Sequence, residues 1–237
     1  MGILKQIKKK LGDYVYFPGC VTHFKLPNIE KNYKRILHLI QVNVLQLDEE
    51  DSFICCGAQL VEQGYPDEFE ELQEKFKEQI NSTGATKIIT NSPLVFHTIR
   101  KYYPTYPSTF ILQLLHKNLN KLNFKKDEKD ITYLDSQYIG RFEGIYEEPR
   151  EILRKIGYNL IEFDKNREEA YCSGAEGGMK ENSPQVAKEV AKRLFKKLST
   201  KILVTADPIA YLHLKENAPK GVEVYEISEL ITKALEN

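Results

Sequence analysis

The chain has four cysteines, and two of them are adjacent in the segment Phe53-Ile54-Cys55-Cys56-Gly57-Ala58. A β-strand would point adjacent thiols in opposite directions, and a disulfide between neighbours is strained. A Cys-Cys-Gly turn can instead aim both sulfurs at one metal centre, because the glycine adopts backbone angles that other residues resist. Cys20 lies upstream in Pro18-Gly19-Cys20, and Cys172 lies far downstream in Tyr171-Cys172-Ser173-Gly174. These cysteines could therefore be metal ligands, redox-active thiols or plain buried residues.

Composition restricts the classes of protein to which the chain can belong. It has 237 residues, 41% of them apolar, which suits one large domain or two of about 110 residues each. The 34 basic and 34 acidic residues balance, so the charge does not favour a nucleic-acid partner. Four cysteines are too few for a secreted disulfide scaffold, and the N-terminus has no apolar signal-peptide region. We therefore expect a cytoplasmic protein without a transmembrane segment.

The first half reads as alternating strands and helices. Residues 1–11 place Ile3, Leu4, Ile7 and Leu11 on one helical face, which predicts a helix packed on the protein body or, alternatively, against a partner or a membrane surface. The strands expected after it are 14–17, 42–47 and 87–90, and the expected helices are 30–41, 61–83, 94–102 and 109–122.

The second half repeats this order after a polar linker at 124–130. The expected strands are 131–134, 159–163, 201–205 and 222–224, and the expected helices are 149–156, 184–198, 211–214 and 227–235. Gln137 follows Cys20 by 117 residues, and Cys172 and Ser173 follow Cys55 and Cys56 by the same 117. Ser92 and Asp207 each precede a proline and are 115 residues apart. Internal duplication is therefore expected.

This alternation predicts the α/β class, with two tandem similar halves at 12–123 and 130–237, or one compact unit. Each half should have a small, mostly parallel sheet, and a pseudo-twofold axis should relate the halves. The cysteine-bearing loops follow the strands, at the ends where α/β folds place their sites.

The layout resembles the cysteine-rich CCG-domain family, which includes the B subunit of heterodisulfide reductase and the iron–sulfur subunit of glycolate oxidase. The family pattern is a cysteine, a long gap, Cys-Cys-Gly, a second long gap and Cys-Pro-x-Cys, and it occurs twice. The resemblance covers roughly residues 14–230. The matching segments are 18–20, 55–58, 140–150, 166–168, 172–178 and 205–208.

The departures from the family pattern are as informative as the matches. Where the first half should have Cys-Pro-x-Cys it has Ser92-Pro93-Leu94-Val95. In the second half, Gln137, Ser173, Asp207 and Ala210 stand at cysteine positions, and only Cys172 remains. Complete family members use five cysteines per half to hold a noncubane [4Fe–4S] assembly or, in some members, zinc. The resemblance therefore implies three of five ligands in the first half and a degenerate second site.

Several chemistries remain open at the first site. Cys20, Cys55 and Cys56 are the predicted metal ligands, and His23, His97 and Ser92 are the candidates for a fourth. Thiolates of this number suit an iron–sulfur cluster or, with a histidine, zinc. Without a metal they could exchange thiols and a disulfide. At the second site one thiolate cannot hold a cluster, and Asp207 and Gln137 are poor ligands for a soft metal.

A charged motif follows the first loop of the second half. Its members can form charge-assisted hydrogen bonds that position the loop, so we predict a structural role. They are Arg141, Glu143, Tyr146, Glu147, Glu148 and Arg150.

These observations predict an iron–sulfur or thiol-based electron-transfer subunit similar to the heterodisulfide reductase B subunit, with at most one metal site. If it is active, it would be an oxidoreductase subunit that receives electrons from a ferredoxin-like or flavoprotein partner. The alternatives are a non-catalytic scaffold or assembly subunit that has lost its clusters, and a zinc-binding structural variant.

Overall fold

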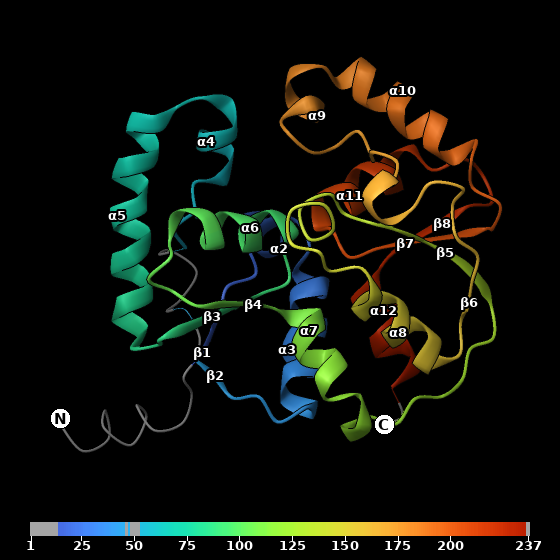
Figure 1. Ribbon diagram of the computed structural model, residues 1–237, viewed down its shortest axis with the longest axis horizontal. Coiled ribbons are helices and arrows are strands. Elements are labelled where there is room, and N and C mark those ends of the chain that lie inside the picture. Colours follow the sequence, from blue (N-terminus) through green and yellow to red (C-terminus); the bar gives the residue numbers. More distant parts are fainter. Residues whose placement is uncertain (1–13, 46, 48–52, 236–237) are drawn as a thin grey trace. The chain divides into compact units, whose positions relative to one another are not determined.

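The computed structural model describes residues 14–45, 47 and 53–235. The chain divides into two compact units, Met1–Leu115 and His116–Asn237, and each contains its own four-stranded sheet (Figure 1). The α/β class with two tandem halves is confirmed. The predicted domain limits 12–123 and 130–237 stay a prediction, and the helix predicted at 1–11 lies outside the described residues.

In the first unit the strands are ordered β2-β1-β3-β4, and every neighbouring pair is parallel. The strands are β1 (Tyr14–Tyr16), β2 (Val44–Leu45), β3 (Lys87–Thr90) and β4 (Ser108–Phe110). The helices are α2 (Cys20–Lys25), α3 (Pro27–Leu39), α4 (Ala58–Gln63), α5 (Pro66–Thr83), α6 (Pro93–Tyr102) and α7 (Ile111–Lys117).

The second unit repeats this topology, with strand order β6-β5-β7-β8 and parallel pairing throughout. Its strands are β5 (Asp130–Leu134), β6 (Asn159–Leu160), β7 (Ile202–Thr205) and β8 (Glu223–Glu226). Its α-helices are α8 (Glu147–Ile156), α9 (Met179–Asn182), α10 (Pro184–Phe195), α11 (Pro208–Asn217) and α12 (Ile227–Ala234). The described part of this unit also contains the 3-10 turns η1 (Leu119–Lys121) and η2 (Arg167–Glu169).

The sequence explains why these elements form where they do. The central strands β1, β3, β5 and β7 consist mostly of fully buried β-branched, leucine and tyrosine residues, as a parallel sheet covered on both faces requires. Five helices begin with a proline, which lacks the amide proton that the first turn leaves unbonded. Glycines in the left-handed conformation end α5 at Gly84 and α8 at Gly157.

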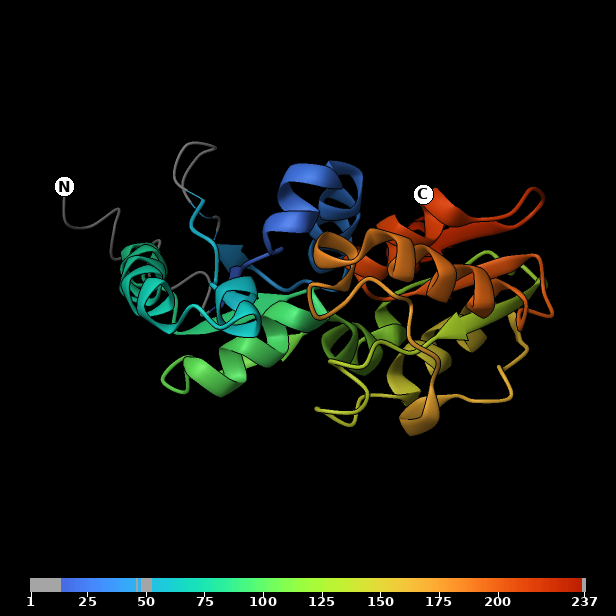
Figure 2. The same cartoon turned by 90° about the horizontal axis from the view of Figure 1, so that it is seen from above.

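Helices cover both faces of each sheet. In the first unit α3 and α6 lie on opposite sides of the sheet (Figure 2). The connection from β1 to β2 and the connection from β3 to β4 run in opposite directions along the sheet. Because both connections are right-handed, their helices cover opposite faces. Helix α5 lies on the same face of the sheet as α6. The two helices are in contact, and Gln73 Nε2 of α5 donates to the carbonyl of Tyr102 at the end of α6 at 2.7 Å. In the second unit α8 packs against α12, and α10 packs against α11.

Two predicted elements were wrong in part. The segment 109–122 begins as strand β4 and becomes helical only at Ile111, because edge pairing with β3 outweighs the helical pattern. The helix expected over 61–83 is two helices, since Gly64 ends α4 with φ of 81° and Pro66 starts α5. The short helix α2 was not predicted. Most other boundaries moved by one to three residues.

Among the residues that the structure describes, no helix is both long enough and apolar enough to span a lipid bilayer.

Candidate functional site

The predicted ligands of the first unit gather at the carboxyl edge of its sheet. Cys20 follows β1, Cys55 and Cys56 follow β2, and Ser92 follows β3. Because the strands are parallel, these loops leave the sheet on the same edge.

The Cys-Cys-Gly turn is held by bonds from three directions. Gly57 has φ of 78°, and its amide donates to Cys55 Sγ at 3.4 Å. The amide of Ile54 donates to Gln79 Oε1 of α5 at 3.1 Å, and the hydroxyl of Tyr103 donates to the carbonyl of Cys56 at 2.8 Å. A Cβ on Gly57 would lie 2.6 Å from the Phe69 ring, so both the backbone angle and the packing require glycine.

The three thiols of this unit interact with one another. Hydrogen bonds from Cys20 and Cys56 stabilise the Cys55 thiolate and lower its pKa to about 3. The same hydrogen bonds, together with burial, raise the pKa values of Cys20 and Cys56. Cys55 is therefore the thiolate of the group, and Cys20 and Cys56 are its proton-bearing donors.

Cys20 is the first residue of α2, and its position depends on a close approach of two loops. A Cβ on Gly19 would lie 2.8 Å from Val95 Cγ2 and 3.6 Å from Ser92 Oγ. Gly19 also has φ of 80°. Glycine at this position therefore lets the loop after β1 lie against the start of α6.

A buried chain of hydrogen bonds, which the sequence patterns did not predict, holds the same loops. The hydroxyl of Tyr16 donates to Asn91 Oδ1 at 2.7 Å, and Asn91 Nδ2 donates to Thr22 Oγ1 at 3.1 Å. The chain connects β1, the loop after β3 and α2. The available signal was an asparagine at the end of a predicted strand, directly before Ser92-Pro93. The structure adds that Asn91 is fully buried and therefore needs partners.

The three candidates for a fourth ligand lie in different surroundings. Ser92 is the N-cap of α6, and its Oγ accepts from the amide of Val95 at 3.5 Å. His23 Nδ1 pairs with Glu30 Oε2 at 3.0 Å, and its ring stacks on Phe53 with centroids 4.6 Å apart. His97 lies in the second turn of α6. The Ser92 side chain lies against the Cys20 loop, with its Oγ 3.6 Å from the position of a Cβ on Gly19.

The donor set suits a soft metal, since three thiols occupy one edge of the sheet. Across residues 14–45, 47 and 53–235, no three histidine, cysteine, aspartate or glutamate side chains surround one point as a single metal ion requires. The thiols are arranged here for mutual hydrogen bonding. Cys20, Cys55 and Cys56 are the residues that would hold a metal or cluster.

In the second unit, hydroxyl and carboxyl groups occupy the equivalent positions. Ser136 Oγ donates to Asp207 Oδ2 at 2.8 Å, and Asp207 Oδ1 accepts from the amides of Ile209 and Ala210 at the start of α11. Ser173 Oγ donates to Glu176 Oε2 at 2.5 Å, and Cys172 Sγ lies 3.8 Å from the same oxygen. Of the predicted residues, Cys172, Ser173 and Asp207 join this network.

Gln137 lies beside it, on the wall of a cavity of about 10 Å³ that Arg141, Cys172 and Glu176 also line. A cavity of this size is comparable to a single water molecule. The cavity is therefore too small to hold an iron–sulfur cluster.

Two buried carboxyl groups set the electrostatics of the second site. Burial raises the pKa of Glu176 to about 7, and the charge of Asp207 adds to this shift. Burial also raises the pKa of Asp207. Sequence patterns did not indicate Glu176 and Ser136 as members of the site, although Glu176 lies within the matched segment 172–178.

The charged motif of the second unit positions loops. Arg150 is fully buried and forms a bidentate pair with Asp135 at 2.7 and 2.8 Å and a second pair with Glu162. Arg141 donates to the carbonyls of Glu168 and Ala170, which precede Cys172. These contacts correspond to the structural role predicted for the motif.

The sequence profile of the Cysteine-rich domain (CCG) matches residues 14–100 and again 131–215, which together exceed half of the chain. The chain belongs to the CCG cysteine-rich domain family. The two matches fall on the two sheets, so each unit is one CCG repeat.

Curated relatives of this CCG protein are redox subunits by name. The chain is 26% identical over 246 residues to the B subunit of fumarate reductase (CoM/CoB) of Methanothermobacter marburgensis, covering 98% of this chain and 49% of the relative. It is 28% identical over 243 residues to the D subunit of dihydromethanophenazine:CoB–CoM heterodisulfide reductase of Methanosarcina acetivorans, covering 93% and 58%. The chain thus spans about half the length of these relatives.

Among solved structures, Picrophilus torridus aspartate racemase is similar with a TM-score of 0.39 and 14% sequence identity, covering 92% of this chain and 90% of the racemase.

Proposed function

We propose that this CCG protein is an electron-transfer subunit of a multi-protein redox complex, with its chemistry at Cys20, Cys55 and Cys56. The gathering of three cysteines at the carboxyl edge of the first sheet is the observation that carries the proposal. The hydrogen bonds that Cys20 and Cys56 give to Cys55 add to it. The names of the relatives support it, since they include subunits of heterodisulfide reductase and proteins called iron–sulfur proteins.

The first unit would hold at most one metal centre. Cys20, Cys55 and Cys56 would be its ligands, and an iron–sulfur cluster bound there would supply one-electron transfer. The chain's own contribution is to gather three thiols, to keep Cys55 ionised and to fix the turn through Tyr103 and Gln79. The partner would be a ferredoxin-like protein or a flavoprotein in a reducing, cytoplasmic compartment.

The second unit would contribute structure to the same subunit. Its cysteine positions carry the Ser136–Asp207 and Ser173–Glu176 hydrogen bonds, so the site is filled by its own side chains. This asymmetry also supports a second candidate function, a scaffold or assembly subunit without a cluster. The substitution of Ser92 and Val95 for the first unit's last two cysteines favours that candidate, since it removes two ligands.

Metal analysis of anaerobically purified protein tests the proposal. We expect iron and acid-labile sulfide in the wild-type chain and their loss in the triple variant C20S/C55S/C56S. The matched control is C172S, which removes the equivalent cysteine of the other unit and should leave the iron content unchanged. The double variant S92C/V95C restores the family's Cys-Pro-x-Cys and should raise iron occupancy.

Other outcomes separate the alternatives. Zinc without iron, lost in the triple variant, would support a zinc-binding structural variant. A metal-free chain whose Cys55 forms a disulfide with Cys20 or Cys56 on oxidation would support thiol exchange. A metal-free chain whose triple variant still assembles with its partner would reject the electron-transfer role in favour of the scaffold.

A further inference from the structure

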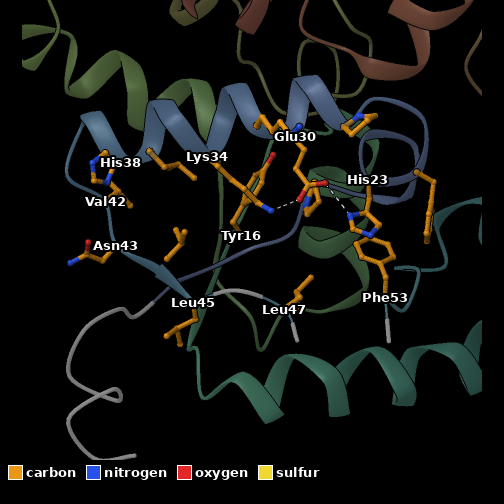
Figure 3. Close-up of a pocket in the computed structure, with 16 residues that line it drawn as sticks. Tyr16, His23, Glu30, Lys34, His38, Val42, Asn43, Leu45, Leu47 and Phe53 are labelled. Atoms are coloured by element: carbon orange, nitrogen blue, oxygen red, sulfur yellow. Dashed lines mark hydrogen bonds and ion pairs between the residues drawn. The ribbon is translucent and has the colours of Figure 1, made fainter. Parts of the chain in front are cut away.

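The first unit contains a cavity of about 730 Å³ that neither the family pattern nor the thiol site explains (Figure 3). It lies between α2, α3 and the segment around β2. Apolar side chains make up much of its wall, and a volume of this size is typical of small-molecule sites. The apolar lining includes Phe24, Leu37, Val42, Val44, Leu45 and Phe53.

A group of charged side chains on α2 and α3 converges on one side of this cavity. Glu30 is 8% exposed, and it accepts from His23 Nδ1 at 3.0 Å and from Lys34 Nζ at 2.5 Å. Figure 3 shows Glu30 between His23 and Lys34, with Tyr16 beside it. The carboxylate thus fixes an ammonium group and an imidazole at the cavity wall.

The balance of charge among the described residues that line the cavity is positive. Lys31 and His38 also line it, and both are exposed on α3. Within this described lining, two lysines and two histidines therefore face one acid, Glu30, whose charge Lys34 already offsets. A ligand that contacts the basic side chains would have a negatively charged group. The same ligand would have an apolar body to contact the apolar side chains that line the rest of the cavity.

We propose that this cavity binds an organic anion with an apolar body, with Lys34 and Lys31 attracting its charge. Pro18 and Phe53 line the cavity and lie two residues before Cys20 and Cys55. The bound anion would therefore lie beside the loops that carry the thiols. The binding site stands on the cavity and its charges, so it does not depend on whether the thiols hold a metal.

A pair of matched dyes tests this proposal on the full-length protein. 8-Anilinonaphthalene-1-sulfonate carries an apolar body and one anionic group, and N-phenyl-1-naphthylamine has the same body without the charge. We expect the sulfonate to bind at one molecule per chain, measured by fluorescence and by calorimetry, and to bind more tightly than the neutral dye. Its affinity should fall as salt screens the lysines.

Charge-removing variants locate the site. K34Q should weaken binding of the sulfonate by about fivefold and K31Q by about threefold, while binding of the neutral dye stays within about twofold. The matched control is K75Q, because Lys75 pairs with Glu71 four residues before it at the same 2.5 Å but lies on α5 outside the cavity. A bulky variant, V44W, should weaken binding of both dyes by narrowing the cavity, with circular dichroism reporting that the fold is intact.

Three outcomes would overturn the proposal: no binding of the sulfonate, equal weakening by K34Q and K75Q, or binding that V44W leaves unchanged. The last two would mean that the dye binds elsewhere on the surface. Metal content of the same samples is measured separately, so that a failure here is distinguishable from a failure of the proposed electron-transfer role.

Discussion

Cys55 and Cys172 occupy equivalent places in the two units and differ in ionisation. Each follows the second strand of its sheet, and each accepts a bond from a glycine amide two residues later, at 3.4 Å from Gly57 and 3.3 Å from Gly174. Cys55 has two thiol donors, which lower its pKa. Cys172 has the carboxyl group of Glu176 instead. Burial raises the pKa of Cys172, and Glu176 adds to the shift. The same turn thus gives a thiolate in one unit and a thiol in the other.

The comparison shows that neighbours, and not the turn itself, set the chemistry of a CCG loop. The backbone frame is retained in both units, since Thr90 accepts from the amide of Ser92 at 3.1 Å and Thr205 accepts from the amide of Asp207 at 3.2 Å. Gly19 approaches Ser92 in the first unit, whereas the hydroxyl of Ser136 bonds to Asp207 in the second. Duplication preserved the frame, and substitution of a few side chains changed what it holds.

The largest expected effect is in the pH dependence of thiol alkylation. In reduced, metal-free protein, the rate of Cys172 should rise about a thousandfold between pH 5 and pH 8, because only the thiolate reacts. The rate of Cys55 should stay nearly constant over this range, because its pKa is lowered to about 3. Iodoacetamide labelling followed by mass spectrometry of the peptides measures both rates in one sample.

Absolute rates are a poor readout for this comparison, because nucleophilicity falls as a thiol's pKa falls. The C20A/C56A variant is the control, since alanine removes both donors and should give Cys55 a pH dependence like that of Cys172. Parallel profiles for the two cysteines in the wild-type protein would contradict the assigned ionisation.

The next largest effect concerns the buried arginine of the second unit. R150M should lower the free energy of unfolding by about 3–5 kcal/mol, because Asp135 would remain buried without its partner. The matched variant R154M lies one turn later on α8, where Arg154 is half exposed and 3.7 Å from Glu147, and should change stability by less than about 1 kcal/mol. Urea unfolding measures both.

The double variant D135N/R150M sharpens this test. It removes the unpaired charge and should recover part of the loss. If R150M and R154M had equal effects, the arginine would not be anchoring the loops of the second unit.

Glu176 should make the second unit lose stability as the pH rises. Its pKa in the folded protein is about 7, above the ordinary value of 4.5, so the folded state holds a proton that the unfolded state releases. Stability from this group is therefore full below about pH 4.5 and falls until the pH exceeds about 7. E176Q removes the penalty and should be more stable than wild type at pH 8 by about 1–3 kcal/mol.

The control for this prediction is E181Q, because Glu181 is exposed on α9. It should follow the wild-type curve at every pH. An E176Q curve with the same slope as wild type between pH 5 and pH 8 would show that Glu176 does not hold the proton.

The smallest expected effect comes from two equivalent tyrosines. The hydroxyl of Tyr16 donates to Asn91, whereas the buried hydroxyl of Tyr133 has no partner among the described residues. The residue that follows β7 is Ala206, at the position that Asn91 occupies after β3. Y16F should cost about 1–2 kcal/mol, and Y133F should be neutral or slightly stabilising. Thermal unfolding of the two variants in parallel measures the difference. Equal losses would indicate that Tyr133 has a partner of its own.

Local sequence patterns were enough to predict the architecture, because the fold depends on patterns that repeat along the chain. Apolar runs, helix-starting prolines and the 117-residue spacing predicted two parallel α/β units, and both sheets are present. Patterns failed where a long-range contact competed with them. The sequence predicted a helix from residue 109 onward, yet pairing with β3 makes residues 108–110 a strand.

The sequence also indicated that the Cys55-Cys56 turn keeps both thiols, whereas the equivalent turn keeps only Cys172 and has Ser173 in the second place. Tertiary contacts set the ionisation of each thiol, since it depends on which donors and carboxyl groups come within reach across loops far apart in the chain. The folded chain also brings Glu176 to Ser173 in the second site and Glu30 to His23 and Lys34 in the cavity. Burial, which sequence spacing does not report, turned these ordinary side chains into the groups that set the local charge.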